Sequence, residues 1–381
     1  MKVHQMKYIL ITDIQYRKEF DTISMVKRLF PNDKIILGTT KGICYSWLCY
    51  GRCIVERLRT EGTFQAFKED FRDLLSKYRQ NEVIYIPMEE QTTDYVISFI
   101  ESQGVQNLKC ILPEARLYRT FRNKKELNKY CINNSIPAPA LYDKEDLPDV
   151  EYPVILKPEI GSGSHGHFRL YSKADYTEDV KSAINRQPYL IQELLPEGKD
   201  VQGAFFLCYQ GKVIDAYTHQ RIRTSPEEGG VTVLSRITDN TELIQQGKAL
   251  LEKAGWEGLI MLEYIYDKRS RKYKVIEANP RVWGSIMLSE FSGANLLSNY
   301  IRICMGEPII RNEKKQDVNI RWLFPMDFLN LIKRKGIMKG FWDFKNTCII
   351  NWTYARKYRS LFFIFLSIIN THNIKKLVDR L

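Results

Sequence analysis

The sequence lacks the signals that direct a chain across or into a membrane. It opens on the polar residues 1–5, and its first apolar run covers only residues 8–11, so no signal peptide is predicted. The apolar run LFFIFLSII at 361–369 is too short for a spanning helix, which needs about 20 apolar residues. These absences predict a cytoplasmic protein.

Cysteine is present but is not arranged for disulfides or zinc. The eight cysteines are scattered over 381 residues, unlike the dense cysteines of a small secreted scaffold. The closest set, Cys44, Cys49 and Cys53, has neither CxxC spacing nor a nearby histidine. We therefore predict reduced thiols and no zinc site.

Several nucleotide and nucleic-acid signatures are also missing. No GxGxxG follows the first expected strand, which removes support for dinucleotide binding. The Gly/Ser run at 161–166 lacks GK[ST] and is not a P-loop. No zinc finger, RNA-binding signature or basic-region heptad occurs, so no nucleic-acid partner is expected.

Positive charge is concentrated at one end. The net charge is +12, and residues 311–381 carry 15 Lys and Arg against five Asp and Glu. Such a basic segment suggests peripheral contact with an anionic membrane at its inner face, with 361–369 lying in the interface. The alternative, which we favour for 361–369, is a helix packed on the body of the protein.

The length suggests two or three domains, since a single core rarely grows this large. Residues 7–113 alternate short apolar runs, such as KYILITD, KIILG and EVIYIP, with helix-like segments. This alternation predicts a parallel, doubly wound sheet. A helix is expected from about 124 to 134, ending before the two prolines at 137 and 139.

Residues 259–281 read as two adjacent strands joined by the basic turn KRSR. Because strand side chains alternate, Glu277 and Asn279 should share a face, and Glu263 lies midway along the partner strand. Two carboxylates and an amide oxygen suit Mg²⁺ or Mn²⁺, which also borrows phosphate ligands from substrates. The alternative is two edge-strand glutamates in solvent.

A short apolar strand at 154–156 ends on Lys157 and leads into a Gly/Ser run. Small residues let backbone amides approach a phosphate closely, and Lys157 can supply the charge. A hairpin turn has the same composition, so the run alone does not decide between them. The residues of this run are Gly161, Ser162, Gly163, Ser164, His165 and Gly166.

A second hairpin is predicted over 203–224, with its turn at Gln210-Gly211. His219, Arg221 and Arg223 fall at alternate positions and would share a face of the second strand. Three side chains that can carry positive charge are unusual on one strand face in a core, and they could hold a carboxylate or phosphate bidentately through arginine. The alternative is a solvated edge strand.

Taken in order, these segments resemble the ATP-grasp superfamily. The order is an Asn-Lys pair at 123–124, the VILKP strand, the Gly/Ser loop, IQELL followed by an acidic residue, then Glu263 and EANPR at 277–281. The resemblance covers about 116–309 and is greatest to carboxylate–amine ligases related to carbamoyl-phosphate synthetase and biotin carboxylase.

The resemblance implies an α/β and α+β chain in four segments. We expect a Rossmann-like domain at 1–113, a linker and small ATP-grasp subdomain at 114–187, and a large subdomain with the metal site at 188–310. A basic, aromatic-rich helical extension would follow at 311–381.

The resemblance also implies roles for individual residues. Lys124 and Lys157 would contact ATP phosphates, with the loop from Gly161 to Gly166 closing over them. Arg281 would steady the transferred phosphoryl or acyl-phosphate charge, and Arg221 and Arg223 are candidates for gripping the acceptor carboxylate. The adenine, ribose and metal contacts would be Gln192, Glu193 and Leu195, then Asp200, then Glu263, Glu277 and Asn279.

Two departures from the family pattern stand out. Asn123 precedes Lys124 where the family often has Asp, and His165 lies within the Gly/Ser loop. The chain also lacks a biotinyl-lysine motif and a synthetase-type second half. These features argue against biotin carboxylation and carbamoyl-phosphate synthesis.

The function implied is an ATP-dependent ligase for a small-molecule carboxylate and amine, releasing ADP and phosphate. Two alternatives remain at this point: a phosphotransferase on the same scaffold, and a non-catalytic nucleotide-binding module. The sequence names neither substrate, because pocket shape rather than a motif sets specificity, and it leaves the oligomeric state open.

Overall fold

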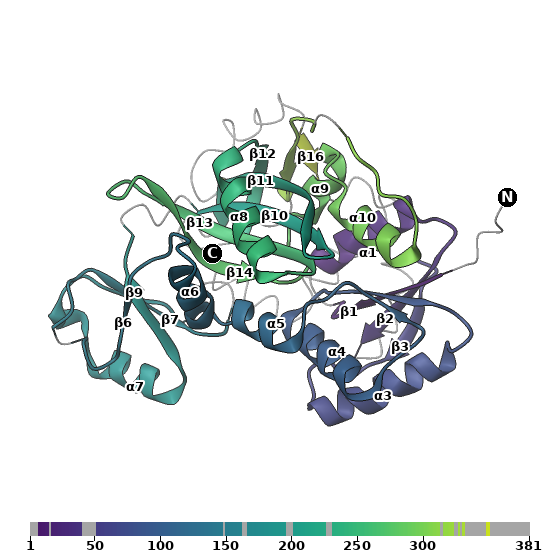
Figure 1. Cartoon of the computed structure of the whole chain (residues 1–381), viewed down its shortest axis with the longest axis horizontal. Helices are drawn as coiled ribbons and strands as arrows, with labels where there is room; N and C mark the ends of the chain where they lie inside the picture. The colour runs from purple at the N-terminus through teal and green to yellow at the C-terminus, as the bar shows by residue number, and fades with distance from the viewer. Residues whose placement is uncertain are drawn as a thin grey trace.

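The computed structural model describes residues 7–14, 17–39, 51–147, 149–161, 166–195, 201–225, 231–312, 315–323, 327, 330–331 and 348–350. They form three sheets with flanking helices (Figure 1). A parallel sheet and a large antiparallel sheet make up the body, and a small antiparallel sheet projects to the left in Figure 1.

The N-terminal sheet has five parallel strands in the order β3-β2-β1-β4-β5. Its central strands are buried because their side chains are apolar on both faces, as expected for a sheet covered by helices. The strand order reverses between β1 and β4, which confirms the expected Rossmann-like arrangement. The elements are β1 (Tyr8–Thr12), α1 (Arg17–Leu29), β2 (Lys34–Thr39), β3 (Ile54–Arg57), α3 (Phe64–Lys77), β4 (Val83–Ile86), α4 (Glu90–Gln103) and β5 (Leu108–Lys109).

Two helices connect this sheet to the small antiparallel sheet, whose strand order is β6-β9-β7-β8. The small sheet has its own apolar core, which includes Val154, Leu156 and Ile191. The elements are α5 (Ala115–Arg122), α6 (Lys124–Asn133), β6 (Leu141–Tyr142), β7 (Val154–Pro158), β8 (Phe168–Leu170), the short helix η1 (Lys173–Asp175), α7 (Glu178–Arg186) and β9 (Tyr189–Glu193).

The large sheet has the order β14-β13-β10-β11-β12-β15-β16, antiparallel except for the last pair. The hairpin of β10 and β11 turns at Gln210 and Gly211, as predicted; both have positive φ, as a tight two-residue turn requires. The elements are β10 (Val201–Tyr209), β11 (Lys212–Ser225), β12 (Val231–Thr238), α8 (Thr241–Ala254), β13 (Gly258–Asp267), β14 (Lys272–Asn279), α9 (Ile286–Ser292), α10 (Leu296–Met305), β15 (Asn319–Arg321) and β16 (Cys348–Ile350).

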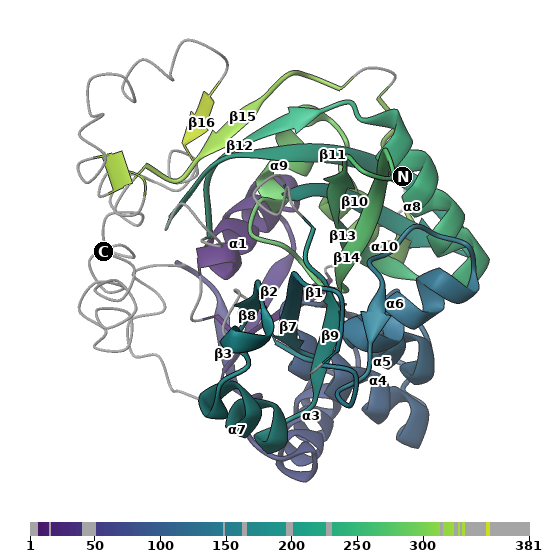
Figure 2. The same cartoon turned by 90° about the vertical axis from the view of Figure 1, so that its left-hand side faces the viewer.

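The parallel sheet and the large sheet share one hydrophobic core. That core contains Ile9 of β1 and Phe205 of β10 together with Trp283 and α10 residues such as Leu297. Tyr300 of α10 donates to the carbonyl of Tyr85 at 2.8 Å and so fixes the two sheets together. Figure 2 shows α1 and α9 between them, and α10 contacts β4 of the parallel sheet and β10 and β13 of the large sheet.

Only a small part of the expected C-terminal extension, 311–381, is described, and it includes two strands. Its described strands, β15 and β16, continue the large sheet beyond β12 with β16 at the edge, so this sheet extends past the expected boundary at 311. The apolar run at 361–369 lies outside the described residues. Within the described part of the chain, no helix is long and apolar enough to cross a membrane.

Candidate active site

The site is built on the hairpin of β13 and β14, where two carboxylates lie directly opposite each other. Glu263 pairs with Glu277, and Met261 pairs with Asn279. Like charges at opposed positions of a sheet destabilise it. A β-bulge follows this pair, because Tyr264 pairs with Val275 and leaves Ile276 over. Bulges of this kind redirect side chains, and this one lies directly beside the two carboxylates.

Two lysines from elsewhere in the chain approach these carboxylates. Lys124, at the start of α6, places Nζ 3.7 Å from Glu277 Oε1 and donates to the carbonyl of Gly161 at 2.5 Å. Lys157, near the end of β7, is also buried. The small sheet and α6 therefore bring positive charge to the acidic hairpin of the large sheet.

Burial shifts the pKa values of this group in opposite directions. Desolvation lowers the pKa of Lys157 to about 8, and Lys124 nearby adds to the effect. Desolvation raises the pKa of Glu277 to about 7, with Glu263 and Glu90 contributing repulsion. Strongly shifted pKa values of this kind are typical of functional sites, where burial and neighbouring charges act on ionisable groups.

Arg281 links the hairpin to the N-terminal sheet. Its Nη2 donates to Asn279 Oδ1 at 2.8 Å, and its Nε lies 3.2 Å from Glu90 Oε1. Glu90 begins α4 and was not predicted, because no motif marks it. Burial alone would lower the pKa of Arg281, but Glu90, Glu89 and Glu277 raise it above its ordinary value, so the guanidinium stays charged.

The donor set fits a magnesium ion. Glu263, Glu277 and Asn279 offer hard oxygen ligands, and a bound cation would relieve the repulsion between the opposed carboxylates. Among the described residues, no three His, Cys, Asp or Glu side chains gather closely enough to hold a metal ion by themselves. Mg²⁺ needs few protein ligands, because water and substrate phosphates complete its octahedron.

Magnesium affinity should depend on pH through Glu277. Because its pKa is raised to about 7, a falling pH protonates the carboxyl below that value. A proton must then leave before the metal binds, so we expect the apparent Mg²⁺ affinity to weaken towards about tenfold per pH unit below 7. Calorimetric Mg²⁺ titrations on either side of this pH would measure it, and a Glu277→Gln variant should lack the slope.

The expected adenine residues lie on and after β9. Gln192 and Leu195 are buried, and Gln192 Oε1 has no hydrogen-bond partner among the described residues. The Glu193 carboxylate is already engaged by Lys274 and by Arg269 Nη2, the latter at 2.7 Å. The backbone N–H of Glu193 donates to the carbonyl of Ala140 at 3.0 Å, so any contact of Glu193 with adenine falls to its backbone carbonyl. Asp200 lies outside the described residues.

The base of the Gly/Ser loop is attached to α6. Asn123 Oδ1 accepts from the backbone of Lys125 at 2.9 Å and of Glu126 at 3.1 Å, which caps the helix. Its Nδ2 donates to Glu159 Oε2 at 2.9 Å. An aspartate could not make that second contact, because it has no donor, so asparagine suits this position. Ser162, Gly163, Ser164 and His165 lie outside the described residues.

The three β11 side chains predicted to share one face, His219, Arg221 and Arg223, have different surroundings in the structure. His219 is buried against Phe205, and its Nδ1 lies 2.9 Å from Ser235 Oγ. Burial, and to a lesser extent Arg221, lowers its pKa to about 3. His219 is therefore a neutral core residue, and the expectation of a third cationic side chain here is wrong.

The two arginines of β11 have different surroundings. Arg223 binds Asp327, with Nη2 3.0 Å from Oδ2, and Asp327 also accepts from the fully buried Arg321 at 2.6 Å. Arg221 donates from Nε to Thr232 Oγ1 at 2.9 Å. A bulge at Ile222 separates them, which is why simple alternation failed to describe this strand. Sequence reasoning missed Arg321 and Asp327, which no motif marks.

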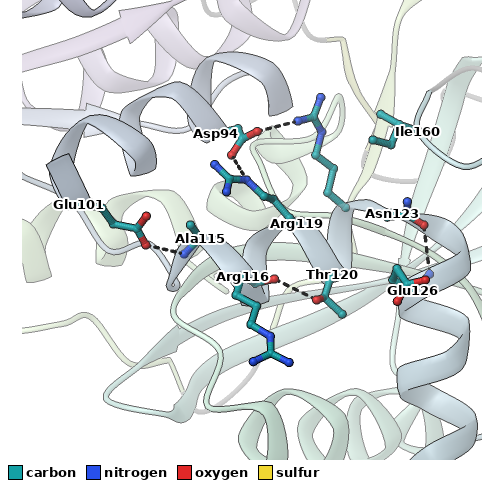
Figure 3. Close-up of a pocket in the computed structure, with 10 residues that line it drawn as sticks. Asp94, Glu101, Ala115, Arg116, Arg119, Thr120, Asn123, Glu126 and Ile160 are labelled. Atoms are coloured by element: carbon teal, nitrogen blue, oxygen red, sulfur yellow. Dashed lines mark hydrogen bonds and ion pairs between the residues drawn. The ribbon is translucent and has the colours of Figure 1, made fainter. Parts of the chain in front are cut away.

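The groove in Figure 3 is separate from this site. Its volume is about 710 Å³, and it runs along α5 with Asp94 and Glu101 of α4 on one side and Ile160 at its rim. Arg119 Nε donates to Asp94 Oδ1 at 2.8 Å, and Glu101 accepts from the backbone of Ala115. None of the metal-site side chains lines it.

Comparison with known sequences points to one kind of protein. Residues 190–325 match the family described as ATP-grasp in the biosynthetic pathway with Ter operon. Acetyl-CoA carboxylase 2 of Oryza sativa is 25% identical over 169 residues, which is 42% of this chain and 7% of the carboxylase. Acetyl-CoA carboxylase of Schizosaccharomyces pombe is 23% identical over 192 residues, 48% of this chain and 8% of that protein. The chain spans less than a tenth of these curated relatives.

Solved structures resemble the chain over most of its length. The ADP complex of N5-carboxyaminoimidazole ribonucleotide synthetase has a TM-score of 0.66 at 14% identity, covering 89% of this chain and 88% of that one. Biotin carboxylase from Campylobacter jejuni gives 0.64 at 16%, covering 83% and 74%. L-amino acid ligase from Bacillus licheniformis gives 0.60 at 15%, covering 80% and 75%.

Proposed function

We propose that this chain, which has the ATP-grasp fold, is an ATP-dependent ligase that activates a carboxylate as an acyl phosphate and couples it to an amine. The observation that carries the proposal is the opposed pair Glu263 and Glu277, beside Asn279 and facing two buried lysines. ATP and Mg²⁺ would supply the charges that this arrangement balances.

The chemistry explains why such a site is needed. A carboxylate is a poor electrophile, and its oxygen is a poor leaving group. When the carboxylate oxygen attacks the γ-phosphorus of ATP, ADP leaves and an acyl phosphate forms. The amine nitrogen then attacks the acyl carbon, the C–O bond breaks with its electrons leaving on phosphate, and the nitrogen loses a proton.

The residues have separate tasks in this scheme. Lys124 and Lys157 would bind the phosphates, and Arg281 would offset charge on the transferred phosphoryl group. Glu263, Glu277 and Asn279 would hold Mg²⁺, which neutralises phosphate charge when bound. Gln192, the backbone of Glu193, Leu195 and Asp200 would surround the nucleoside, and the loop at 161–166 would exclude water.

The function is tested by measuring ADP and phosphate release with Mg·ATP across amino acids and small carboxylates, with products identified by mass spectrometry. ADP formation that requires both a carboxylate and an amine, with an amide product, would establish the ligase. A stable phosphoester would instead identify a phosphotransferase. Binding of ATP without turnover on any substrate pair would favour a nucleotide-binding module.

Substitutions of Arg221 and Arg223 should have different effects, one on substrate binding and the other on stability. An Arg223→Met change should lower the free energy of unfolding by about 3 kcal/mol, because it removes a partner of the buried Asp327. An Arg221→Met change should leave stability within about 0.5 kcal/mol. It should raise KM for the carboxylate substrate about tenfold, because a charged hydrogen bond is lost.

Thermal unfolding and steady-state kinetics on both variants would test this difference. An unchanged KM in Arg221→Met would remove Arg221 from the substrate site. An unchanged stability in Arg223→Met would show that the contact with Asp327 does not hold this part of the sheet. The two variants serve as controls for each other, because they remove the same charge two residues apart.

The partners proposed are a small-molecule carboxylate and a small-molecule amine, in the cytoplasm. Peripheral membrane contact through 311–381 is a further proposal, and residues 351–381 lie outside the described part of the chain. Sedimentation with anionic liposomes, with and without residues 352–381, would test it. Equal recovery of both forms in the pellet would count against that segment.

A further inference from the structure

A second charged cluster lies at the carboxyl ends of β1 and β4. Asp13 follows β1, Lys18 and Glu19 lie in the first turn of α1, and Glu89 follows β4. Lys18 Nζ lies 2.6 Å from Glu89 Oε1 and donates to the carbonyl of Met88 at 2.5 Å. The same Nζ is 3.9 Å from Glu19 Oε1, beyond hydrogen-bond distance. The cluster therefore contains three carboxyl groups and one ammonium.

Glu19 has no hydrogen-bond partner although it is fully buried. Its side chain is 0% exposed, and neither carboxyl oxygen accepts a hydrogen bond from a described residue. Asp13 Oδ1 accepts from Thr92 Oγ1 at 2.9 Å, but Asp13 Oδ2 also lacks a partner. Burial raises the pKa of both carboxyl groups, and the attraction of Lys18 offsets this only in part at Glu19. Buried polar groups of folded proteins nearly always have partners, so three such oxygens together need an explanation.

The cluster lies beside the active site. The backbone N–H of Val282 donates to the carbonyl of Pro87 at 2.8 Å, which joins the end of β4 to the segment that carries Arg281. Glu90 is in contact with Arg281 Nε at 3.2 Å, and Glu89 is the preceding residue. In open α/β sheets, ligands bind at the strand ends where the strand order reverses, which here is between β1 and β4. The Glu89 side chain is 31% exposed, so this edge of the cluster lies at the protein surface.

We propose that Asp13, Glu19 and Glu89 bind the ammonium group of the amine substrate. The cluster has more carboxyl groups than ammonium groups, and a protonated primary amine brings a second positive charge and three N–H donors for the oxygens that accept no hydrogen bond. The three carboxyl groups would repel a carboxylate or phosphate. The carboxylate substrate is therefore expected on the Arg281 side of the contact between Glu90 and Arg281. The charge of this cluster indicates that the ligand is a protonated amine. That this amine is the nucleophile of the reaction rests on the proposed ligase function.

The test uses a simple diamine and does not require turnover. Binding of 1,3-diaminopropane, with 1,3-propanediol as its neutral analogue, would be measured by calorimetry and thermal unfolding at constant ionic strength. The wild-type protein should bind the diamine saturably, and Glu19→Gln and Asp13→Asn should bind it at least tenfold more weakly. Asp73→Asn, an exposed change on α3 of the same domain, should bind it as the wild type does.

The free protein gives a second measurement that distinguishes binding from structure. Because neither oxygen of the buried Glu19 carboxyl group accepts a hydrogen bond from a described residue, Glu19→Gln should unfold at the same temperature as the wild type or higher. A carboxylate that served only to hold the fold would give a lower unfolding temperature. Asp13→Asn provides an independent variant if Glu19→Gln does not fold.

Three results would overturn the site: diamine affinity unchanged in both variants, equal stabilisation by potassium ions, or equal stabilisation by the diol. The outcome is separable from that of the ligase proposal. Weakened diamine binding without any ligation would overturn the ligase and leave the ammonium site. Ligation with an amine KM unchanged by Glu19→Gln would overturn the ammonium site alone.

Discussion

A Glu277→Gln variant is expected to lose turnover, with kcat/KM lower by about a thousandfold or more, while remaining folded. Glu277 faces Glu263 across the hairpin and lies within 3.7 Å of Lys124. The amide keeps the shape of the side chain but removes the charge that holds Mg²⁺ against the phosphates. Steady-state ADP release at saturating Mg·ATP would measure the loss.

The variant should not be destabilised, because the amide relieves the repulsion between opposed carboxylates. A Glu242→Gln change on the exposed face of α8 removes the same charge and should leave turnover unaltered. Near wild-type activity in Glu277→Gln would remove this hairpin as the metal site. An equal loss in the Glu242 control would attribute the effect to general charge.

A Lys157→Met variant should lose about a hundredfold to a thousandfold in kcat/KM for ATP. Methionine preserves most of the volume but not the ammonium that would face the phosphates. Desolvation lowers the pKa of Lys157 to about 8, so the free enzyme loses this positive charge as pH rises through that value. ATP affinity of the wild type should therefore fall above about pH 8, and the variant should lack that step.

Stability should move in the opposite direction from activity. A lysine whose folded pKa is depressed destabilises the fold while it is charged, and this cost is relieved as pH rises from about 8 towards its unfolded value. Lys157→Met should therefore be as stable as the wild type or more stable near neutral pH. Lys173→Met, an exposed change in the same subdomain, should alter neither ATP affinity nor stability. A destabilised Lys157→Met with normal ATP affinity would contradict both expectations.

Local patterns predicted the elements that carry the metal site. Side-chain alternation placed Glu277 and Asn279 on one face, and the structure has them two residues apart on β14 beside Glu263 of β13. The Gln210-Gly211 turn was predictable because few residue pairs accept positive φ twice in succession. The apolar runs of the N-terminal region likewise predicted a parallel sheet. Each of these depends on neighbours in the chain.

Local patterns could not predict which distant side chains would complete the site. Glu90 meets Arg281 across 191 positions, and Lys124 meets the hairpin only because α6 packs on β14. Arg223 follows a bulge at Ile222 and binds Asp327. Strand periodicity predicts neither the bulge nor this partner. The sequence made His219 a potential cation, because its burial against Phe205 cannot be seen from the strand alone.

The sequence alone determined the order of elements, the likeness to ATP-grasp proteins and the residue types available for phosphate and metal. Those properties are local, since they follow from backbone periodicity and side-chain chemistry. The tertiary structure decided the charge state and partners of each group, because desolvation and Coulomb interactions depend on distances in space. It alone brought Asp13, Glu19 and Glu89 together beside Arg281, where two sheets distant in sequence meet.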